Sequence, residues 1–290
     1  MGRLTRTHPV ISYGSQEPSR RVDVLAVEEP LEIRLNGEPF QVTMRTPGND
    51  IDLVHGLLYS ESVIADRTDV ATMSYCEGCG PGGRGGVVPP GSQPNPDGLN
   101  TYNVLEVRLA PHVLPLSPDL HRHVLTTSAC GICGTTSIDQ VVRSSRYQLP
   151  ADVRIASETV LAAPNLLRGQ QRAFAKTGGL HAAGLLSTDG TMVCVREDVG
   201  RHNAVDKVIG WAIREARLPL SNLVLTVSGR ASFELTQKAV LAGIPMLAAV
   251  SAPSSLAVEL AETAGLTLAG FVRGASMNVY THPERVKLSC

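Results

Sequence analysis

The sequence predicts an α/β protein with an added α+β region at its N-terminal end. Within residues 151–290, short aliphatic segments of strand character alternate with segments of helical periodicity. That order is typical of a largely parallel sheet that helices cover on both faces. Residues 22–150 open instead with closely spaced strand-like segments and one short helix. Residues 1–21 are expected to form an N-terminal tail.

The N-terminal region is expected to begin with three strands. They are residues 22–27, 31–35 and 40–44. Asn36 and Gly37 stand between the last two, and this pair is a strong signal for a β-hairpin turn. Asn49 and Asp50 then precede an apolar-periodic helix that runs to about Leu58.

Two loops interrupt this region. Residues 80–98 are dense in glycine and proline and show no periodicity, so we expect a long surface loop or insertion there. A strand is expected at residues 105–109, where apolar and charged side chains alternate. The second loop, residues 126–136, contains Cys130 and Cys133 among glycine, serine and threonine residues.

The α/β domain is expected to contain five strands and three helices. The strands are residues 180–186, 192–195, 223–227, 246–250 and 266–271. The helices are residues 205–213, 234–242 and 256–264, with N-caps at Asn203, at Ser232, and at Ser254 or Ser255. Side-chain oxygens of Asn and Ser accept hydrogen bonds from the first helical turn. Gly265 is placed to end the third helix.

The composition limits the classes of partner that the chain is expected to bind. Of its 290 residues, 43% are hydrophobic and 18% are charged, and the formal net charge is −1. A charge so close to zero gives no general attraction to nucleic acid or to an anionic membrane, so we expect neither as a partner. The longest apolar run, near residues 241–250, contains Gly243 and Pro245 and is too short to span a membrane.

The cysteines indicate a compartment and a chemistry. The first residues lack the apolar stretch of a secretory signal, so we expect a cytoplasmic protein whose six cysteines stay reduced. Cys130 and Cys133, separated by two residues, have no bulky neighbours that would bury the sulfurs. Such thiols can share a metal ion, form a disulfide or pass on a sulfur atom, and only the thiolate form is reactive. We therefore expect this pair to be presented for chemistry.

Three turns are candidates for an anion site. Residues 227–232 carry Ser228, Gly229 and Arg230, residues 251–255 are rich in serine, and residues 271–276 again offer arginine, glycine and serine. Each turn follows a predicted strand, and ligands of α/β sheets bind at that edge. Taken singly, each is more simply a polar turn with a helix cap. Together they favour a phosphate-bearing ligand, although no Walker loop or dinucleotide-binding fingerprint is present.

A polar run at residues 196–203 is a further candidate. In one interpretation, Asp198, Arg201 and His202 line a cleft that Lys207 extends; in the other, the run is a solvated turn with a helix cap. His181 lies in an apolar strand, where a lone histidine is more often an interior residue than a ligand.

Four of these segments together resemble the FdhD/NarQ family. They are residues 130–134 (Cys-Gly-Ile-Cys-Gly), 198–207, 228–230 and 279–283. The similarity runs from about residue 29 to about residue 285, and residues 80–98 lie outside the family pattern. The resemblance implies a cytidine-deaminase-like, three-layer α/β/α domain with an added N-terminal region, in a homodimer.

The resemblance also implies a function. Family members are sulfur carriers, or sulfurtransferases, that formate dehydrogenase maturation requires. They take sulfane sulfur from a cysteine desulfurase as a persulfide and deliver it to the bis-molybdopterin guanine dinucleotide form of the molybdenum cofactor, which is a substrate; no resident metal is expected. The carrier maps onto Cys130, with Cys133 beside it. The expected cofactor-binding residues are Phe271, Val272, Arg273, Gly274, Ala275 and Ser276, together with Ser228, Gly229, Arg230 and His202.

Three rival functions are suggested by the cysteines and by the expected fold. Cys76 and Cys79 supply a second C-x-x-C, so the alternative is a zinc-binding structural or interaction module using Cys76, Cys79, Cys130 and Cys133. Deamination lacks support, because alanine stands where its glutamate should follow His181 and no later cysteine pair exists. A thioredoxin-like dithiol needs a helix start after the motif. Residues 135–137 (Thr-Thr-Ser) are poor helix formers, and residues 138–142 are the first that could start one.

Overall fold

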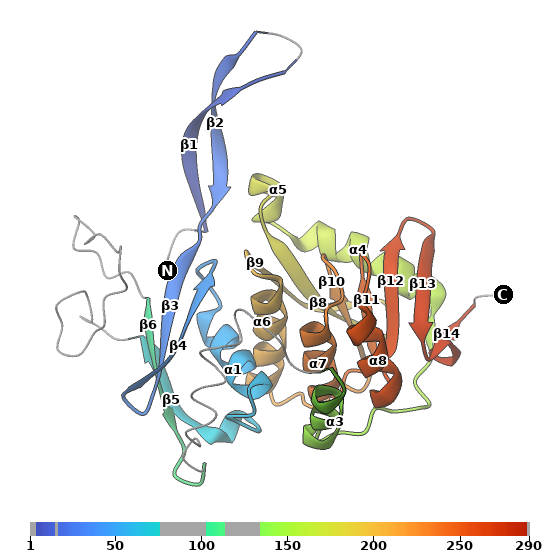
Figure 1. Cartoon of the computed structure of the whole chain (residues 1–290). Helices are drawn as coiled ribbons and strands as arrows, with labels where there is room; N and C mark the ends of the chain where they lie inside the picture. Colours follow the sequence, from blue (N-terminus) through green and yellow to red (C-terminus); the bar gives the residue numbers. More distant parts are fainter. Residues whose placement is uncertain (1–3, 15–16, 76–102, 114–133, 289–290) are drawn as a thin grey trace.

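The central feature of the fold is a six-stranded sheet between layers of helices (Figure 1). The computed structural model describes residues 4–14, 17–75, 103–113 and 134–288. The strand order is β13-β12-β11-β10-β8-β9. The strands are β8 (His181–Ser187), β9 (Met192–Asp198), β10 (Leu223–Val227), β11 (Met246–Ala249), β12 (Thr267–Arg273) and β13 (Ser276–Thr281). The predicted α/β class is confirmed.

Successive strand residues point to two different helical layers. The helices are α4 (Ser157–Gln170), the single turn α5 (Phe174–Thr177), α6 (Arg201–Arg214), α7 (Phe233–Leu241) and α8 (Ser255–Ala264). Leu225 and Leu247 belong to the core beneath α6, α7 and α8. Their neighbours Val224 and Met246 pack instead with Val160 of α4. The two-residue period of a strand thus produces the three layers.

The sheet is mixed, so the prediction of a largely parallel sheet was wrong. Only the pairs β10–β11 and β11–β12 are parallel; β8–β9, β8–β10 and β12–β13 are antiparallel. The chain reverses tightly after β8 and after β12, at Gly190 and Gly274, whose φ angles are 88° and 59°. Parallel neighbours need a long crossover, and these short glycine turns allow none.

The N-terminal region forms a second sheet, in the order β4-β3-β6-β5. Its elements are β3 (Glu29–Leu35), β4 (Glu38–Arg45), α1 (Asp50–Ser60), the turn η1 (Arg67–Asp69), β5 (Val70–Tyr75) and β6 (Val104–Leu109). Asn36 and Gly37 have φ angles of 52° and 92°, the left-handed values of a hairpin turn, so this prediction is confirmed. Strand β5 was missed because its apolar residues do not alternate.

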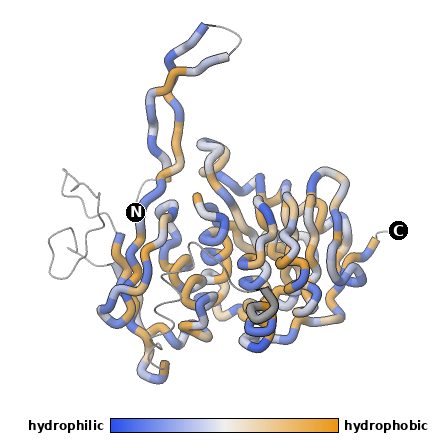
Figure 2. Tube along the Cα trace, viewed as in Figure 1, coloured by the Kyte–Doolittle hydropathy of each residue, from blue (hydrophilic) through white to orange (hydrophobic). Residues whose placement is uncertain are grey.

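An arm projects from this region. Strands β1 (Thr5–Ser12) and β2 (Ser19–Ala26) pair only with each other and stand away from the body (Figure 1). Hydrophobic residues recur along it (Figure 2), and Ile11 and Val22 are 56% and 68% exposed. Residues 5–12 therefore form a strand rather than part of a tail.

Two short strands from distant parts of the chain pair with each other. Strand β7 (Ile155–Ala156) pairs in parallel with β14 (Val286–Lys287), which follows the turn η2 (Pro283–Arg285). Arg285 is buried there and donates to the carbonyl of Pro150.

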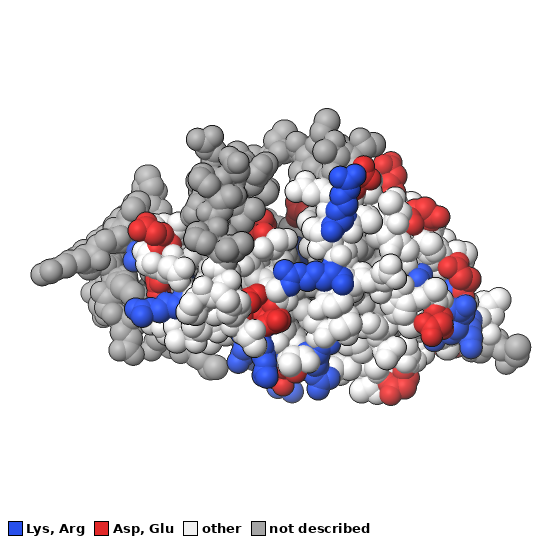
Figure 3. Space-filling view, turned by 90° about the horizontal axis from the view of Figure 1, so that it is seen from below, with Lys and Arg blue, Asp and Glu red and all other residues white. Residues whose placement is uncertain are grey.

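Seen from below, charges of both signs are interspersed over the described surface (Figure 3). Within the described ranges, no helix is both long and apolar enough to cross a membrane.

Two glycines allow α1 and α6 to pack backbone against backbone. A Cβ atom on Gly56 would lie 1.9 Å from the carbonyl oxygen of Asp206, and one on Gly210 would lie 1.7 Å from that of Asp52. The core at this contact contains residues of both sheets and of α6, namely Ile33 of β3, Leu225 of β10 and Val208 of α6 among others. The N-terminal region and the α/β domain therefore share one continuous core.

Replacing Gly210 with alanine is expected to destabilise the fold by about 3 kcal/mol, because the methyl group would push the two helix backbones apart. Gly169 of α4 provides a matched control, since a Cβ atom there meets nothing within 4 Å. Gly169→Ala should stabilise by about 0.5 kcal/mol, because alanine is the better helix former. Urea denaturation measures both; equal stabilities of the two variants would contradict the packing.

Helix α3 (Gly134–Ser144) was not expected to begin where it does. The poor helix formers at residues 135–137 argued against a start directly after the cysteine motif. Ile138 and Val141 are buried in the main core, where α3 packs against α7 and α8. Tertiary packing of these side chains overrides the weak local propensity.

Candidate functional site

The three predicted anion turns meet at one edge of the central sheet. The amide of Ser251 donates to the carbonyl of Gly229 at 3.3 Å, and the amide of Phe271 donates to the carbonyl of Ser251 at 3.2 Å. These bonds extend the sheet ladder past the ends of β10 and β11, as far as Phe271 within β12. The structure thus brings the three turns together, as the parallel strand order requires.

The turn at residues 271–276 differs from expectation in one respect. It joins β12 to β13 as a hairpin and leads into no helix. Val272 is fully buried in the core beneath α4, so its side chain is turned away from any ligand at the edge. Arg273, Gly274, Ala275 and Ser276 are exposed, and the Arg273 guanidinium lies 5.6 Å from the ring centroid of Phe271.

Ser228 serves mainly to fix its turn. Its hydroxyl accepts from the amide of Ala182 at 2.9 Å, and its own amide donates to the carbonyl of Ala182 at 3.0 Å. The Ser228 hydroxyl also lies 3.5 Å from Nδ1 of His181. Gly229 is half-buried, whereas Arg230 is exposed and so offers its guanidinium to solvent.

His202 lies at the same edge, in the first turn of α6. Its Nε2 is 2.8 Å from a carboxylate oxygen of Glu234 and 3.4 Å from the hydroxyl of Ser232. This hydrogen bond lowers the pKa of the Glu234 carboxyl against the effect of its partial burial, and the charges of His202, Lys238 and Arg201 act in the same direction. Ser232 was predicted only as a helix cap and Glu234 was missed, because thirty-odd residues separate them from His202.

His181, expected as an interior residue, is half-buried at this edge. Because β8 runs antiparallel to β10, its first residue lies beside the end of β10. Burial, followed by the charges of Arg201 and His202, lowers the pKa of the imidazole. His181 is therefore neutral at physiological pH and can either donate or accept a hydrogen bond.

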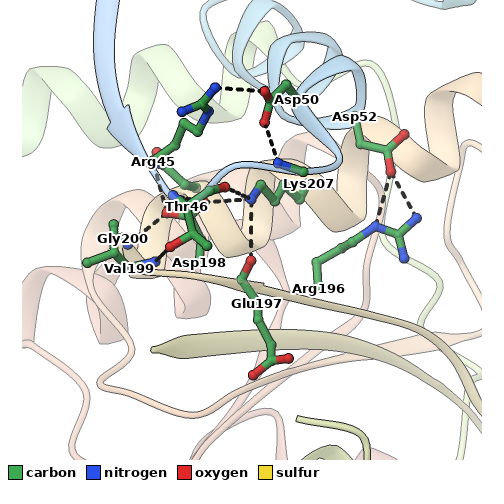
Figure 4. A network of polar contacts seen from close by, with 12 residues as sticks. Arg45, Thr46, Asp50, Asp52, Arg196, Glu197, Asp198, Val199, Gly200 and Lys207 are labelled. Atoms are coloured by element: carbon green, nitrogen blue, oxygen red, sulfur yellow. Dashed lines mark hydrogen bonds and ion pairs between the residues drawn. The ribbon is translucent and has the colours of Figure 1, made fainter. Parts of the chain in front are cut away.

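Asp198 and Lys207 do not line a cleft, so that interpretation was wrong. Their side chains are 0% and 1% exposed and form an ion pair at 2.7 Å (Figure 4). Lys207 also donates to the carbonyls of Thr46 and Glu197, and the Thr46 amide donates to Asp198. This network ties the N-terminal region to the α/β domain.

Asn203 also belongs to that network rather than to a helix cap. Helix α6 begins at Arg201 with Gly200 as the N-cap. The side-chain amide of Asn203 donates to the carbonyl of Met44 at 2.8 Å and to Asp198 at 3.1 Å. The predicted cap was thus three residues late, because a buried aspartate, and not the helix terminus, uses the asparagine.

A neighbouring buried carboxylate joins three elements. Asp52 of α1 accepts from Nε and Nη2 of Arg196 on β9 (Figure 4). It also accepts from Arg214 of α6. Both nitrogens of Arg196 donate to the same oxygen, Oδ2, whereas Arg214 donates to the other, Oδ1. Both carboxylate oxygens thus accept charge-assisted hydrogen bonds. Like the pair of Asp198 and Lys207, these charges stabilise the junction between the two parts of the chain.

The four cysteines of the two C-x-x-C motifs, Cys76, Cys79, Cys130 and Cys133, lie outside the described residues. Helix α3 begins at Gly134, directly after Cys133 in the sequence. Cys194 is buried, and burial raises the pKa of its thiol to about 11, which makes it unreactive at neutral pH. Among the described residues, no group of three or more His, Cys, Asp or Glu could hold a metal ion.

Comparison with known proteins gives consistent matches over the whole chain. The sequence pattern of the FdhD/NarQ family matches residues 26–287. A Nocardia farcinica protein named sulfur carrier protein FdhD is 55% identical over 287 residues, which cover 99% of this chain and 96% of that protein. A Mycobacterium tuberculosis protein of the same name is 54% identical over 287 residues, covering 99% and 100%.

A solved structure supports the fold. It belongs to a protein from Desulfotalea psychrophila that is assigned as a formate dehydrogenase accessory protein. The TM-score is 0.74 at 21% identity, and the match covers 98% of this chain and 100% of the other. At this identity, the likeness concerns the arrangement of helices and strands alone.

Proposed function

This chain belongs to the FdhD/NarQ family, and on that premise we propose that it is a sulfur carrier needed for formate dehydrogenase activity. It takes sulfane sulfur from a cysteine desulfurase as a persulfide on Cys130 and delivers it to bis-molybdopterin guanine dinucleotide. It acts as a homodimeric sulfurtransferase in the cytoplasm, where thiols stay reduced. The observation that carries this proposal is the identity of 55%, across nearly the full length, to a relative named as a sulfur carrier.

The start of α3 supports a reactive thiolate. The first amide groups of a helix have no partner within the helix, and together with the helix dipole they favour negative charge. Because α3 begins at Gly134, this favourable field lies next in sequence to the cysteine motif. The weak helix pattern at residues 135–137 counted against an activated dithiol, but the helix begins there rather than at residue 138.

Sulfur uptake requires one exchange step. The Cys130 thiolate attacks the terminal sulfur of the desulfurase persulfide, a bond forms between the two sulfurs, and the bond to the desulfurase cysteine breaks. The desulfurase leaves as a thiolate, and Cys130 becomes the persulfide without any change in overall oxidation state. Two roles for Cys133 fit its position: attack on Cys130 Sγ, which expels hydrosulfide and leaves a disulfide, or modulation of its neighbour.

The turns at the sheet edge supply a site for the phosphates of the guanine dinucleotide. Arg230 and Arg273 are exposed on the turns that follow β10 and β12, on either side of the turn after β11. Helices α7 and α8 begin directly after the turns that follow β10 and β11. Arginine and helix N-terminal amides are the usual protein partners of phosphate oxygens.

The decisive experiment measures both sulfur uptake and the binding of a guanine nucleotide. The wild-type protein, incubated with a cysteine desulfurase and free cysteine, should gain the mass of one sulfur atom, which a thiol reductant removes. It should also bind guanosine diphosphate in a calorimetric titration. Cys194→Ala should load normally because that thiol is buried and protonated. A protein that takes up no sulfur, and instead holds stoichiometric zinc that is lost when either cysteine pair is changed, would be the zinc module considered above.

A further inference from the structure

The first turn of α6 has an unusual charge arrangement. A helix N-terminus carries partial positive charge and favours acidic residues. Helix α6 has none in its first turn and instead begins with Arg201 and His202. Two basic side chains and the positive end of a helix dipole therefore lie together at the same edge of the sheet as the turn at residues 228–230.

The surrounding elements provide only part of the compensating charge. Asp198 is committed to Lys207 and to the amides of Thr46 and Gly200. Glu234 contacts His202 at 2.8 Å, but its side chain is 50% exposed. In the described part of the chain, the buried Nε of Arg201 has no hydrogen-bond partner.

The neighbouring groups are suited to an anion rather than to another cation. The Ser232 hydroxyl lies 3.4 Å from Nε2 of His202 at the start of α7, so a second helix N-terminus faces the cluster. The charge of Arg201 contributes to lowering the pKa of both His181 on β8 and Glu234 on α7, so it acts on both elements. Three elements thus meet at a basic cluster whose contacting carboxylate, Glu234, is half exposed to solvent.

We propose that Arg201, His202 and Ser232 form a phosphate-binding subsite, in which Glu234 is an internal counter-ion that the bound phosphate displaces. This inference rests on the proposed function, since the phosphate would be that of the guanine dinucleotide held at the neighbouring turns. A phosphate matches the group because arginine can donate to two of its oxygens, while an imidazole N–H and the hydroxyl can donate to others. Glu234 holds His202 in place when the subsite is empty.

Two substitutions with opposite effects test the subsite. Arg201→Gln should weaken the binding of guanosine diphosphate about tenfold or more, since a charge-assisted hydrogen bond to phosphate is lost. Its affinity for guanosine, which has no phosphate, should not change. Glu234→Gln should tighten guanosine diphosphate binding about threefold, because the competing half-exposed carboxylate is removed. Inorganic pyrophosphate should compete with guanosine diphosphate on the wild-type protein.

Two variants serve as matched controls. Lys287→Gln on β14 and Glu259→Gln on α8 change exposed charges and should leave both affinities unchanged. Wild-type protein that binds no guanine nucleotide would overturn the proposed function. Wild-type protein that binds guanosine diphosphate, with Arg201→Gln binding it equally well, would overturn the subsite alone. Should Arg201→Gln fail to fold, Glu234→Gln decides: unchanged or weaker binding refutes the displaced counter-ion.

Discussion

Replacing Cys130 with alanine is expected to abolish persulfide loading. The carrier step requires a thiolate that attacks a sulfane sulfur, and alanine has no atom that can hold the transferred sulfur. The described part of the chain offers no substitute, because its cysteine, Cys194, is buried with a raised pKa. Intact-mass measurement after incubation with a desulfurase and cysteine should show no added sulfur on Cys130→Ala.

Cys133→Ala separates the two roles of the second cysteine. If Cys133 expels the sulfur, Cys133→Ala should load normally, retain its persulfide, and form no disulfide during turnover. If Cys133 only modulates its neighbour, loading should slow but release should proceed. Normal loading of Cys130→Ala, with the sulfur found on another cysteine, would remove Cys130 from its assigned role.

Replacing Lys207 with methionine is expected to destabilise the protein by about 4 kcal/mol, among the largest effects of any single change. The new side chain is unbranched and only one heavy atom shorter than that of lysine, but it leaves Asp198 fully buried without its 2.7 Å partner. It also leaves the carbonyl of Thr46 without the ammonium that donates to it at 2.9 Å. The attachment of the N-terminal region to the α/β domain should therefore loosen.

Urea denaturation with a double-mutant cycle checks this expectation. Lys176 of α5 is exposed, so Lys176→Met should change the stability little. Combining Lys207→Met with Asp198→Asn should cost less than the sum of the two single changes, because no unpaired buried charge remains. Stability losses that simply add, or a Lys207→Met variant as stable as Lys176→Met, would contradict the buried pair.

The elements that short-range patterns specify were predicted well. The turn at Asn36 and Gly37, the start of α7 after Ser232 and the end of α8 at Gly265 were all found from local signals. These signals work because turns and caps depend on the backbone conformation of one or two residues. The meeting of the three turns followed from strand order, since consecutive parallel strands end at the same edge.

The misplaced or missed features depend on contacts between distant segments. Residues 135–137 hid the start of α3 because Ile138 and Val141 are stabilised by α7 and α8, not by local propensity. Residues 5–12 looked like a tail because their strand pairs only across the arm. The predicted strand directions were wrong where a short turn at a glycine reverses the chain.

The family, the alternation of strands and helices, and the cysteine pair could all be identified before folding was considered, because each depends on residues close together along the chain. Which charged residues are buried and which are available became known only from the folded chain. Asp198 and His202 lie four residues apart, yet one is sealed with Lys207 and the other faces Glu234. The reason is physical: the state of an ionisable side chain depends on the groups that folding brings around it, and those groups come from elements far away in the sequence.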